Sequence, residues 1–395
     1  MIRLGFTSTF FPPQIGGLPA VLNLLLPWLA QHEIAVTVAV GTDVPDGWHY
    51  RGVTVLRFAE IAAYRRTFFD YLTGGSTTLE ELDVACNEAA TAITRAFGAE
   101  RIELIHNYLN FELGQRAAES LGLPVVVTFH TPQYTREEFE QAGASYYARA
   151  DWLLEQYTRL RPSAVVTATQ FALHRWRSRG LICPFMVTIP YPLNGAFRPV
   201  SPAYKTTARD TLRIDLSQRV ICFVQRPAKP GMDVMLRAAA LLREQVPELK
   251  LLITGSDTPP VPLAIQTQSL NLGDVVMCRA FQTHEMLLPY AAADAVILPN
   301  PVEGFGLPAV EALACGVPVV APATPLFSEF LGDFPGALLF EPGSVVSLAD
   351  TLHHALSDPR VLQYASSSAS VVRQRYSVDR VGNDHLDLYH TLLEE

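Results

Sequence analysis

The sequence has no apolar run long enough to cross a membrane. Although 49% of its 395 residues are hydrophobic, they form short runs that never approach the roughly 18 consecutive apolar residues of a membrane helix. The first residues predict a strand and a loop rather than a signal peptide. These absences favour a cytoplasmic protein and do not favour membrane contact.

Cysteine and charge are both scarce. The five cysteines are dispersed, odd in number and without metal-ligand spacing, namely Cys86, Cys183, Cys222, Cys278 and Cys315. They predict reduced, buried thiols and no metal site. Charged residues make up only 17% of the chain and the net charge is −9, which argues against a surface that coats nucleic acid. The hydrophobic content excludes a disordered chain.

The length and the pattern of the chain predict two α/β domains. A single core rarely supports 395 residues, and strand-like runs alternate with helical ones in both halves, which is typical of parallel sheets covered by helices. Four prolines within residues 189–202 mark a linker between the halves. The strand-like runs are residues 4–9, 36–40, 104–106, 125–129, 164–167, 220–224, 250–254, 275–277, 295–298 and 317–321.

Two glutamates eight positions apart, Glu303 and Glu311, form the most informative motif. They lie in the segment PVEGFGLPAVEALACG, residues 301–316, which follows a short buried strand. Pro308 suits the first turn of a helix and Gly316 suits the position after its end. The segment therefore predicts a loop at the carboxyl end of a strand, where open α/β sheets bind ligands. Amides at the helix start favour an anion, and Glu311 can accept hydrogen bonds from neutral hydroxyls.

This motif, with GFGLP between the glutamates and EALACGVPVV at its end, resembles the donor motif of family 4 retaining glycosyltransferases of GT-B fold. The resemblance implies two doubly wound, Rossmann-like domains that face each other across a cleft. Residues 1–195 would form the acceptor side and residues 196–376 the donor side, with residues 377–395 crossing back to the first domain. The donor would be a nucleoside diphosphate sugar and the acceptor an unidentified hydroxyl compound, with no metal and no cofactor.

A basic pair follows the first strand of the second half. The resemblance implies that Arg226 and Lys229 hold the diphosphate, whose negative charge grows as the sugar leaves. The family usually places its lysine five residues after the arginine and directly before a glycine. Here the lysine comes three residues after, and Pro230 precedes Gly231. The alternative is a solvated basic loop.

Polar and glycine residues also follow strands of the first half. Gly16 and Gly17 precede a helix start, where free amides can bind a phosphate or an acceptor group, although such a pair can equally form a simple turn. His130 ends a strand, and the resemblance places it near the donor sugar; the alternative is a satisfied core histidine. His106 and Asn107 end another strand, and we expect them to help shape the acceptor side.

The resemblance assigns roles to these residues. Glu303 would accept hydrogen bonds from the sugar, Glu311 from the ribose, and His130 would orient the sugar during front-face attack by the acceptor. The predicted catalytic residues are Glu303, His130, Arg226 and Lys229. The predicted donor-binding residues are Gly16, Gly17, Arg226, Lys229, Gly255, Phe281, Glu303, Gly304, Phe305, Gly306, Leu307 and Glu311.

Other interpretations of the same sequence stay open. A phosphorylase or another enzyme that uses a sugar phosphate would keep the anion site without a base pocket. A non-catalytic sugar-nucleotide binder is suggested only by the displaced Lys229. A dehydrogenase is less favoured, because no GxGxxG motif follows the first strand. The aromatic residues Phe68, Phe69 and Tyr71 either line an acceptor pocket, touch lipid or form a half-buried helix face.

Overall fold

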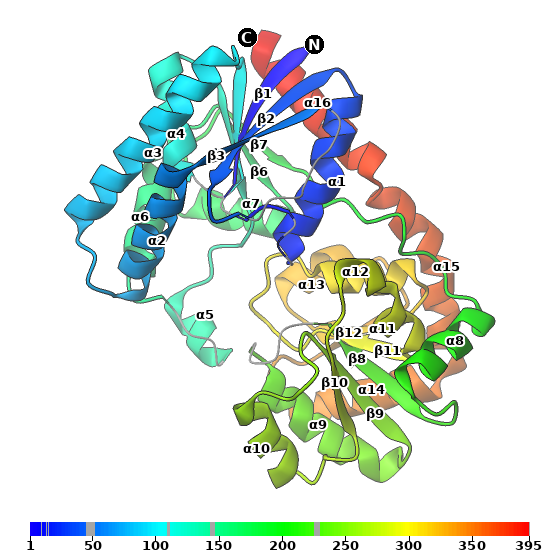
Figure 1. Ribbon diagram of the computed structural model, residues 1–395. Coiled ribbons are helices and arrows are strands. Elements are labelled where there is room, and N and C mark those ends of the chain that lie inside the picture. Colours follow the sequence, from blue (N-terminus) through cyan, green and yellow to red (C-terminus); the bar gives the residue numbers. More distant parts are fainter. Residues whose placement is uncertain are drawn as a thin grey trace. The chain divides into compact units, whose positions relative to one another are not determined.

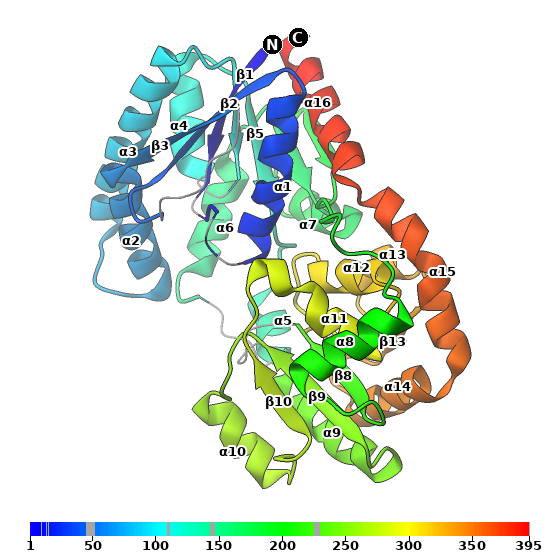
Figure 2. The ribbon, with the colours of Figure 1, turned by 45° about the vertical axis from the view of Figure 1, so that its right-hand side comes forward.

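The computed structural model describes residues 1–8, 10–12, 14, 16–44, 52–108, 111–142, 147–224 and 230–394. The chain folds into two compact units. Unit 1 comprises Met1–Gln133, Tyr146–Pro192 and Val378–Glu395, and unit 2 comprises Tyr134–Ser145 and Leu193–Ser377. Figure 1 and Figure 2 show the ribbon of both units, coloured along the chain.

Unit 1 is built on a sheet whose seven strands pair in parallel, in the order β3-β2-β1-β4-β5-β6-β7. The strands are β1 Ile2–Thr7, β2 Ile34–Gly41, β3 Val53–Phe58, β4 Leu104–Asn107, β5 Val125–Phe129, β6 Ala164–Thr167 and β7 Phe185–Thr188. The strand order reverses between β1 and β4, which is the position at which open α/β sheets usually bind ligands.

Helices cover both faces of this sheet (Figures 1 and 2). They are α1 Gly17–Gln31, α2 Ala59–Thr73, α3 Leu79–Ala99, α4 Phe111–Leu121, α6 Ala150–Arg159, α7 Gln170–Ser178 and α16 Val378–Glu394. The last helix packs against the first: Trp28 Nε1 donates to Asp379 Oδ1 at 2.7 Å. A Cβ on Gly382 would overlap the Trp28 ring, so glycine is required for this close approach.

Unit 2 repeats the architecture with six parallel strands in the order β10-β9-β8-β11-β12-β13. The strands are β8 Arg219–Phe223, β9 Leu249–Thr254, β10 Val276–Arg279, β11 Ala295–Ile297, β12 Val319–Pro322 and β13 Ala337–Phe340. The helices are α5 Arg136–Gln141, α8 Pro202–Leu212, α9 Met232–Gln245, α10 Val261–Ser269, α11 Leu287–Ala292, α12 Leu307–Ala314, α13 Pro325–Leu331, α14 Val345–Ser357 and α15 Pro359–Arg375, with a 3-10 turn at Thr283–Glu285. The strand order reverses between β8 and β11.

The predicted fold class, two doubly wound parallel sheets, is confirmed. All ten expected strands are present, and the structure adds β3, β7 and β13, each at the edge of a sheet. Most residues of these edge strands are half-buried, so they lack the continuous apolar pattern that marks a central strand. The segment Tyr134–Ser145 joins unit 2, whereas the sequence predicts it within the first domain.

In the part of the chain that the structure describes, no helix combines the length and the apolar character needed to span a bilayer. The five cysteines are all free thiols, and four of them are buried, with Cys183 half-buried.

Candidate functional site

The loop that carries Glu303 leaves the sheet of unit 2 beside the point where the strand order reverses. It follows β11, whose neighbours in the sheet are β8 and β12. Loops at such a reversal diverge and form the usual ligand site of an open α/β sheet. The helix α12 begins directly after this loop at Leu307, with Pro308 in its first turn as expected from the sequence.

Glu303 is held in place by two side chains of unit 2. The Asn300 amide Nδ2 donates to Glu303 Oε1 at 2.9 Å, and the Tyr134 hydroxyl donates to the Glu303 main-chain oxygen, also at 2.9 Å. Asn300 and Tyr134 are buried, with 4% and 7% of their surface exposed. Neither was identified in the sequence, although the position of Asn300 just after the β11 strand could have been a signal.

Glu311 lies one turn into α12, partly buried, and accepts a hydrogen bond on Oε2 from the hydroxyl of Tyr290. Burial raises the pKa of Glu311 to about 7, and the hydrogen bond from Tyr290 acts against this rise. Among the described residues, no other hydrogen-bond donor reaches this carboxylate. A buried carboxylate with unused acceptor capacity suits ligand hydroxyls, which would stabilise its ionised form.

The residues between the two glutamates have structural roles in the loop and the core. Gly306 has φ +88°, and a Cβ there would lie 3.0 Å from the Phe327 ring. Phe305 is 3% exposed and stacks on Phe330 at 5.2 Å, so its side chain belongs to the core and only its main chain can meet a ligand. Gly304 and Leu307 are half-buried.

Arg226 and Lys229, the predicted diphosphate ligands, lie outside the described residues. The chain is described again from Pro230, and Gly231 caps α9 with φ +85°. A Cβ on Gly231 would overlap the Pro299 oxygen, so this helix start packs closely against the chain just after β11. The start of α9 therefore lies close to the beginning of the glutamate loop.

Gly255 and Phe281 follow β9 and β10, the two outer strands on the other side of β8. Gly255 has φ +98°, and its N–H donates to the Arg279 oxygen at 3.0 Å. A turn explains this glycine without a ligand. Phe281 is half-buried.

In unit 1, the glycine pair lies at the start of a helix, as expected. Gly16 is the N-cap of α1 and Gly17 its first residue. The predicted inward face of this helix is buried, with Val21, Leu25, Trp28 and Leu29 each at most 6% exposed. The helix start follows β1, beside the reversal of strand order in this sheet, which is the topology expected of a ligand loop.

His130 follows β5 and has partners for both ring nitrogens within unit 1. Nε2 lies against the Tyr108 carbonyl, and Nδ1 is 2.7 Å from the Tyr191 hydroxyl. Because a carbonyl only accepts, the proton is on Nε2 and Tyr191 donates to Nδ1. Burial lowers the pKa of His130 to about 4, so the ring is neutral at pH 7. A sugar can bind a His130 nitrogen only by replacing one of these partners.

His106 corrects an expectation, because it cannot shape an acceptor site. It is fully buried, with Nδ1 2.7 Å from the Tyr389 hydroxyl and Nε2 2.7 Å from Thr128 Oγ1. The pair with Tyr389 joins α16 to the sheet. Asn107 is also fully buried, and its Oδ1 accepts from Thr7 Oγ1 at 2.7 Å. Both residues belong to the core of unit 1.

The aromatic residues of α2 also pack inward. Tyr71 belongs to a core cluster of unit 1 and Phe68 packs against that cluster. The Tyr71 ring lies 4.8 Å from Trp152 and 4.1 Å from the Arg149 guanidinium. Phe69 is half-buried and lies 6.4 Å from Phe10. The arrangement matches the half-buried helix face that the sequence left open as one of three interpretations.

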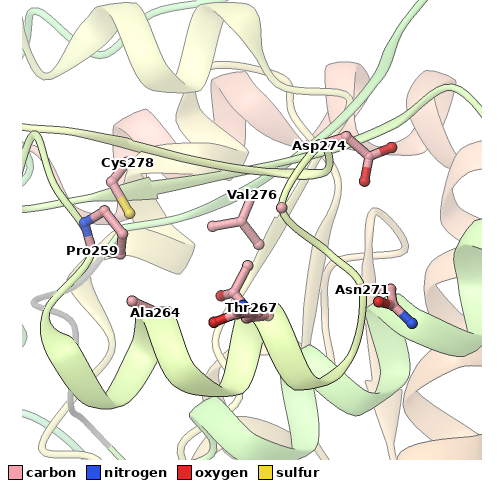
Figure 3. Close-up of a pocket in the computed structure, with 9 residues that line it drawn as sticks. Pro259, Ala264, Thr267, Asn271, Asp274, Val276 and Cys278 are labelled. Atoms are coloured by element: carbon pink, nitrogen blue, oxygen red, sulfur yellow. The ribbon is translucent and has the colours of Figure 1, made fainter.

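A hollow of about 480 Å³ lies in unit 2 between α10 and β10 (Figure 3). Val276 and Cys278 extend toward it from the strand and Thr267 from the helix, and the Thr267 hydroxyl has no hydrogen-bond partner among the residues that the structure describes. None of the predicted site residues that the structure describes lines it. Among the described residues, no three His, Cys, Asp or Glu side chains group closely enough to hold a metal ion.

Known proteins resemble this chain in sequence over most of its length. The family model of "Glycosyl transferases group 1" matches residues 205–371. A D-inositol 3-phosphate glycosyltransferase from Segniliparus rotundus is 30% identical over 326 residues, which span 78% of this chain and 69% of the relative. The chain belongs to the group 1 glycosyltransferases.

Other relatives of this glycosyltransferase carry similar descriptions. The protein of the same name from Salinispora tropica is 29% identical over 344 residues, 81% of this chain and 71% of the relative. The match to the homologue from Mycolicibacterium smegmatis, at 30% identity, spans 66% of this chain and 61% of that protein. An uncharacterized glycosyltransferase from Methanocaldococcus jannaschii is 22% identical over 412 residues, 100% of this chain and 99% of the relative.

Solved glycosyltransferase structures share the two-unit fold. Sucrose-phosphate synthase from Thermosynechococcus elongatus superposes with a TM-score of 0.79 at 19% identity, over 100% of both chains. Anabaena HepE in complex with UDP and glucose superposes with a TM-score of 0.76 at 18% identity, over 99% of this chain and 100% of that one. These similarities show that the fold is GT-B.

Proposed function

We propose that this glycosyltransferase moves a sugar from a nucleoside diphosphate sugar to a hydroxyl acceptor, with retention of the anomeric configuration and without a metal ion. The observation that carries the proposal is the pair of carboxylates beside the strand reversal in unit 2. Glu303 stands in the loop after β11, and Glu311 stands one turn into the helix that follows, partly buried and with acceptor capacity to spare.

In this proposal each carboxylate binds hydroxyls of the donor. Glu303 accepts from the sugar and Glu311 from the ribose, whose hydroxyls would stabilise the ionised carboxylate against the burial that raises its pKa. Arg226 and Lys229 would hold the diphosphate and stabilise the charge that grows on it as the sugar leaves. No enzymic nucleophile is required, since the acceptor attacks on the face that the diphosphate leaves and a phosphate oxygen takes its proton.

His130 would orient the sugar through one of its ring nitrogens. Its neutral state supports this role, because a neutral imidazole can exchange one neutral partner for another without a change in charge. Most of the catalysis would then come from positioning and electrostatic stabilisation.

Two further features support the proposed donor and acceptor and a cytoplasmic location of the protein. Anabaena HepE, which shares the fold, binds UDP and glucose, and several relatives are named for D-inositol 3-phosphate. A cyclitol phosphate is therefore one acceptor to test. The free thiols fit a reducing compartment, which supports the cytoplasm.

The test is replacement of Glu303 by Ala. Stabilisation of the wild type against heat by UDP-, GDP- and ADP-sugars first identifies the donor, because a ligand raises stability by mass action. In Glu303→Ala, kcat/KM for that donor should fall about a thousandfold, since several hydrogen bonds to a charged group are lost. The melting temperature should stay unchanged.

Glu341→Ala is the matched control, because Glu341 is an exposed glutamate of the same unit and should retain full activity. Near-wild-type turnover in Glu303→Ala contradicts the proposal. Product analysis should show the donor's anomeric configuration retained, and added EDTA should leave the rate unchanged.

A further inference from the structure

Glu303 lies at the centre of a set of hydrogen bonds that fix both its side chain and its main chain. Asn300 Nδ2 donates to Glu303 Oε1 at 2.9 Å, and the Tyr134 hydroxyl donates to the Glu303 carbonyl oxygen at 2.9 Å. One bond sets the carboxylate and the other sets the peptide that follows the residue. Together the two hydrogen bonds restrict both the position of the Glu303 main chain and the rotation of its side chain.

The orientation of the Asn300 amide is determined by the loop itself. Asn300 Oδ1 accepts from the Val302 N–H at 3.2 Å, and since an N–H can only donate, the oxygen must be on that side. The NH2 group then faces the Val302 oxygen, at 3.2 Å, and the Glu303 carboxylate. Asn300 thus presents a donor, never an acceptor, to Glu303.

Tyr134 comes from a part of the chain remote from the loop in sequence. It is 169 residues from Glu303 and belongs to the segment Tyr134–Ser145 of unit 2, which also contains α5. The helix begins with a capping box between Thr135 and Glu138, directly after Tyr134. The ring of Phe139 lies edge-on to that of Tyr134 at 6.0 Å. The capped helix and the ring contact restrain the tyrosine whose hydroxyl meets the Glu303 peptide.

We propose that Tyr134 and Asn300 are positioning residues that preorganise Glu303 for the donor sugar, which rests on the function proposed above. Asn300 holds the carboxylate at a set angle through its N–H donor. Tyr134 holds the main chain of the loop. A carboxylate that is already oriented binds the sugar without first losing its own freedom of rotation, which raises the rate of transfer.

The first test replaces Tyr134 by Phe, which removes only the hydroxyl. We expect kcat/KM for the donor found among UDP-, GDP- and ADP-glucose to fall about fivefold, the usual effect of one neutral hydrogen bond. The affinity for the nucleoside diphosphate alone should not change, because Glu303 contacts the sugar. Tyr204→Phe is the control, since Tyr204 is 37% exposed on α8, and it should match the wild type.

The second test uses two substitutions of Asn300. Asn300→Ala should lower kcat/KM roughly thirtyfold, because a hydrogen bond to a charged group is lost. Asn300→Asp keeps the shape but places a second carboxylate against Glu303, and two facing carboxylates share one proton. Its activity relative to wild type should therefore be lowest at pH 8 and rise several-fold toward pH 5.5, a recovery that a merely structural asparagine would not produce.

The outcomes separate the two proposals. If the wild type cleaves or transfers from one of the three donors while Tyr134→Phe and Asn300→Asp match it at every pH, the positioning role is wrong and the proposed function stands. If the wild type neither binds nor cleaves any of the UDP-, GDP- and ADP-sugars, the proposed function is wrong and the positioning role falls with it. Should Asn300→Ala fail to fold, Tyr134→Phe and the pH profile of Asn300→Asp still decide.

Discussion

The strand ends of the two units carry polar groups of opposite character. In unit 1, His106 lies near the end of β4 and His130 directly follows the neighbouring β5, and each has both ring nitrogens hydrogen-bonded within the unit. In unit 2, Glu311 lies in α12, the helix that follows the end of β11. Among the described residues it accepts a hydrogen bond from one donor, Tyr290. A polar residue near a strand end indicates a ligand most strongly where its hydrogen-bonding capacity is not already used.

Burial acts on these groups in opposite directions. It lowers the pKa of His130 and His385 to about 4 and raises the pKa of Glu311 to about 7. In both cases burial favours the neutral form. The buried histidines should therefore lower the stability of unit 1 as the pH falls. The buried Glu311 should lower the stability of unit 2 as the pH rises. Three experiments test this difference.

The largest expected effect is acid unfolding of unit 1. A histidine with a lowered pKa contributes stability that is present above its ordinary pKa of 6.5 and is lost as the pH falls through about 4. This difference corresponds to roughly 3 kcal/mol for each of His130 and His385. All four tryptophans of the chain lie in unit 1, so urea unfolding followed by tryptophan fluorescence reports on that unit.

His385→Gln is the informative variant for this experiment. His385 Nδ1 donates to the Val381 oxygen at 2.8 Å, and a glutamine amide can keep that bond without gaining a proton. Because His106 and His130 keep their lowered pKa values, the variant should lose about two-thirds as much stability as the wild type between pH 6.5 and pH 4. Identical pH profiles of the two proteins would show that His385 does not contribute to acid unfolding.

The second effect concerns Glu311→Gln. The raised pKa means that the stability contributed by Glu311 is present below its ordinary pKa of 4.5 and is lost as the pH rises through about 7. Removing the charge should therefore raise the free energy of unfolding of unit 2 by up to about 3 kcal/mol at pH 8, and by little at pH 4.5. Donor affinity should fall about a hundredfold at pH 8, because bonds from the ribose hydroxyls to a carboxylate are lost.

Titration calorimetry and denaturant unfolding at the two pH values measure these changes. The exposed Glu244 of α9 supplies the control, since Glu244→Gln should change neither quantity. A Glu311→Gln protein with wild-type affinity would show that Glu311 is only a buried acid and not a donor ligand.

The smallest expected effect is that of His130→Gln. Its two partners are neutral groups of unit 1, so glutamine can preserve part of the network. We expect kcat to fall about tenfold, the effect of one weakened contact to the sugar, with unchanged affinity for the nucleoside diphosphate. A variant with full kcat and a lower melting temperature would make His130 a structural residue like His106.

Much of the fold follows from local patterns in the sequence. The central strands are continuous apolar runs, and Gly306, Pro308 and Gly316 mark the loop before α12, its first turn and its end. The edge strands β3, β7 and β13 are not predicted because they are half exposed and their patterns are weak. The sequence also places residues 134–145 in the first domain, since no local signal distinguishes a segment that packs elsewhere.

The sequence by itself determined the family, the two parallel sheets and the pair Glu303 and Glu311, because these depend on residues within about one strand, loop and helix of each other. Only the tertiary structure decided which polar strand ends are already satisfied. His106 meets Tyr389 across 283 positions, His130 meets Tyr191 across 61, and Tyr134 meets Glu303 across 169. Hydrogen bonds between such distant positions form only when the chain has folded. They therefore cannot be predicted from the periodicity or the spacing of residues in the sequence.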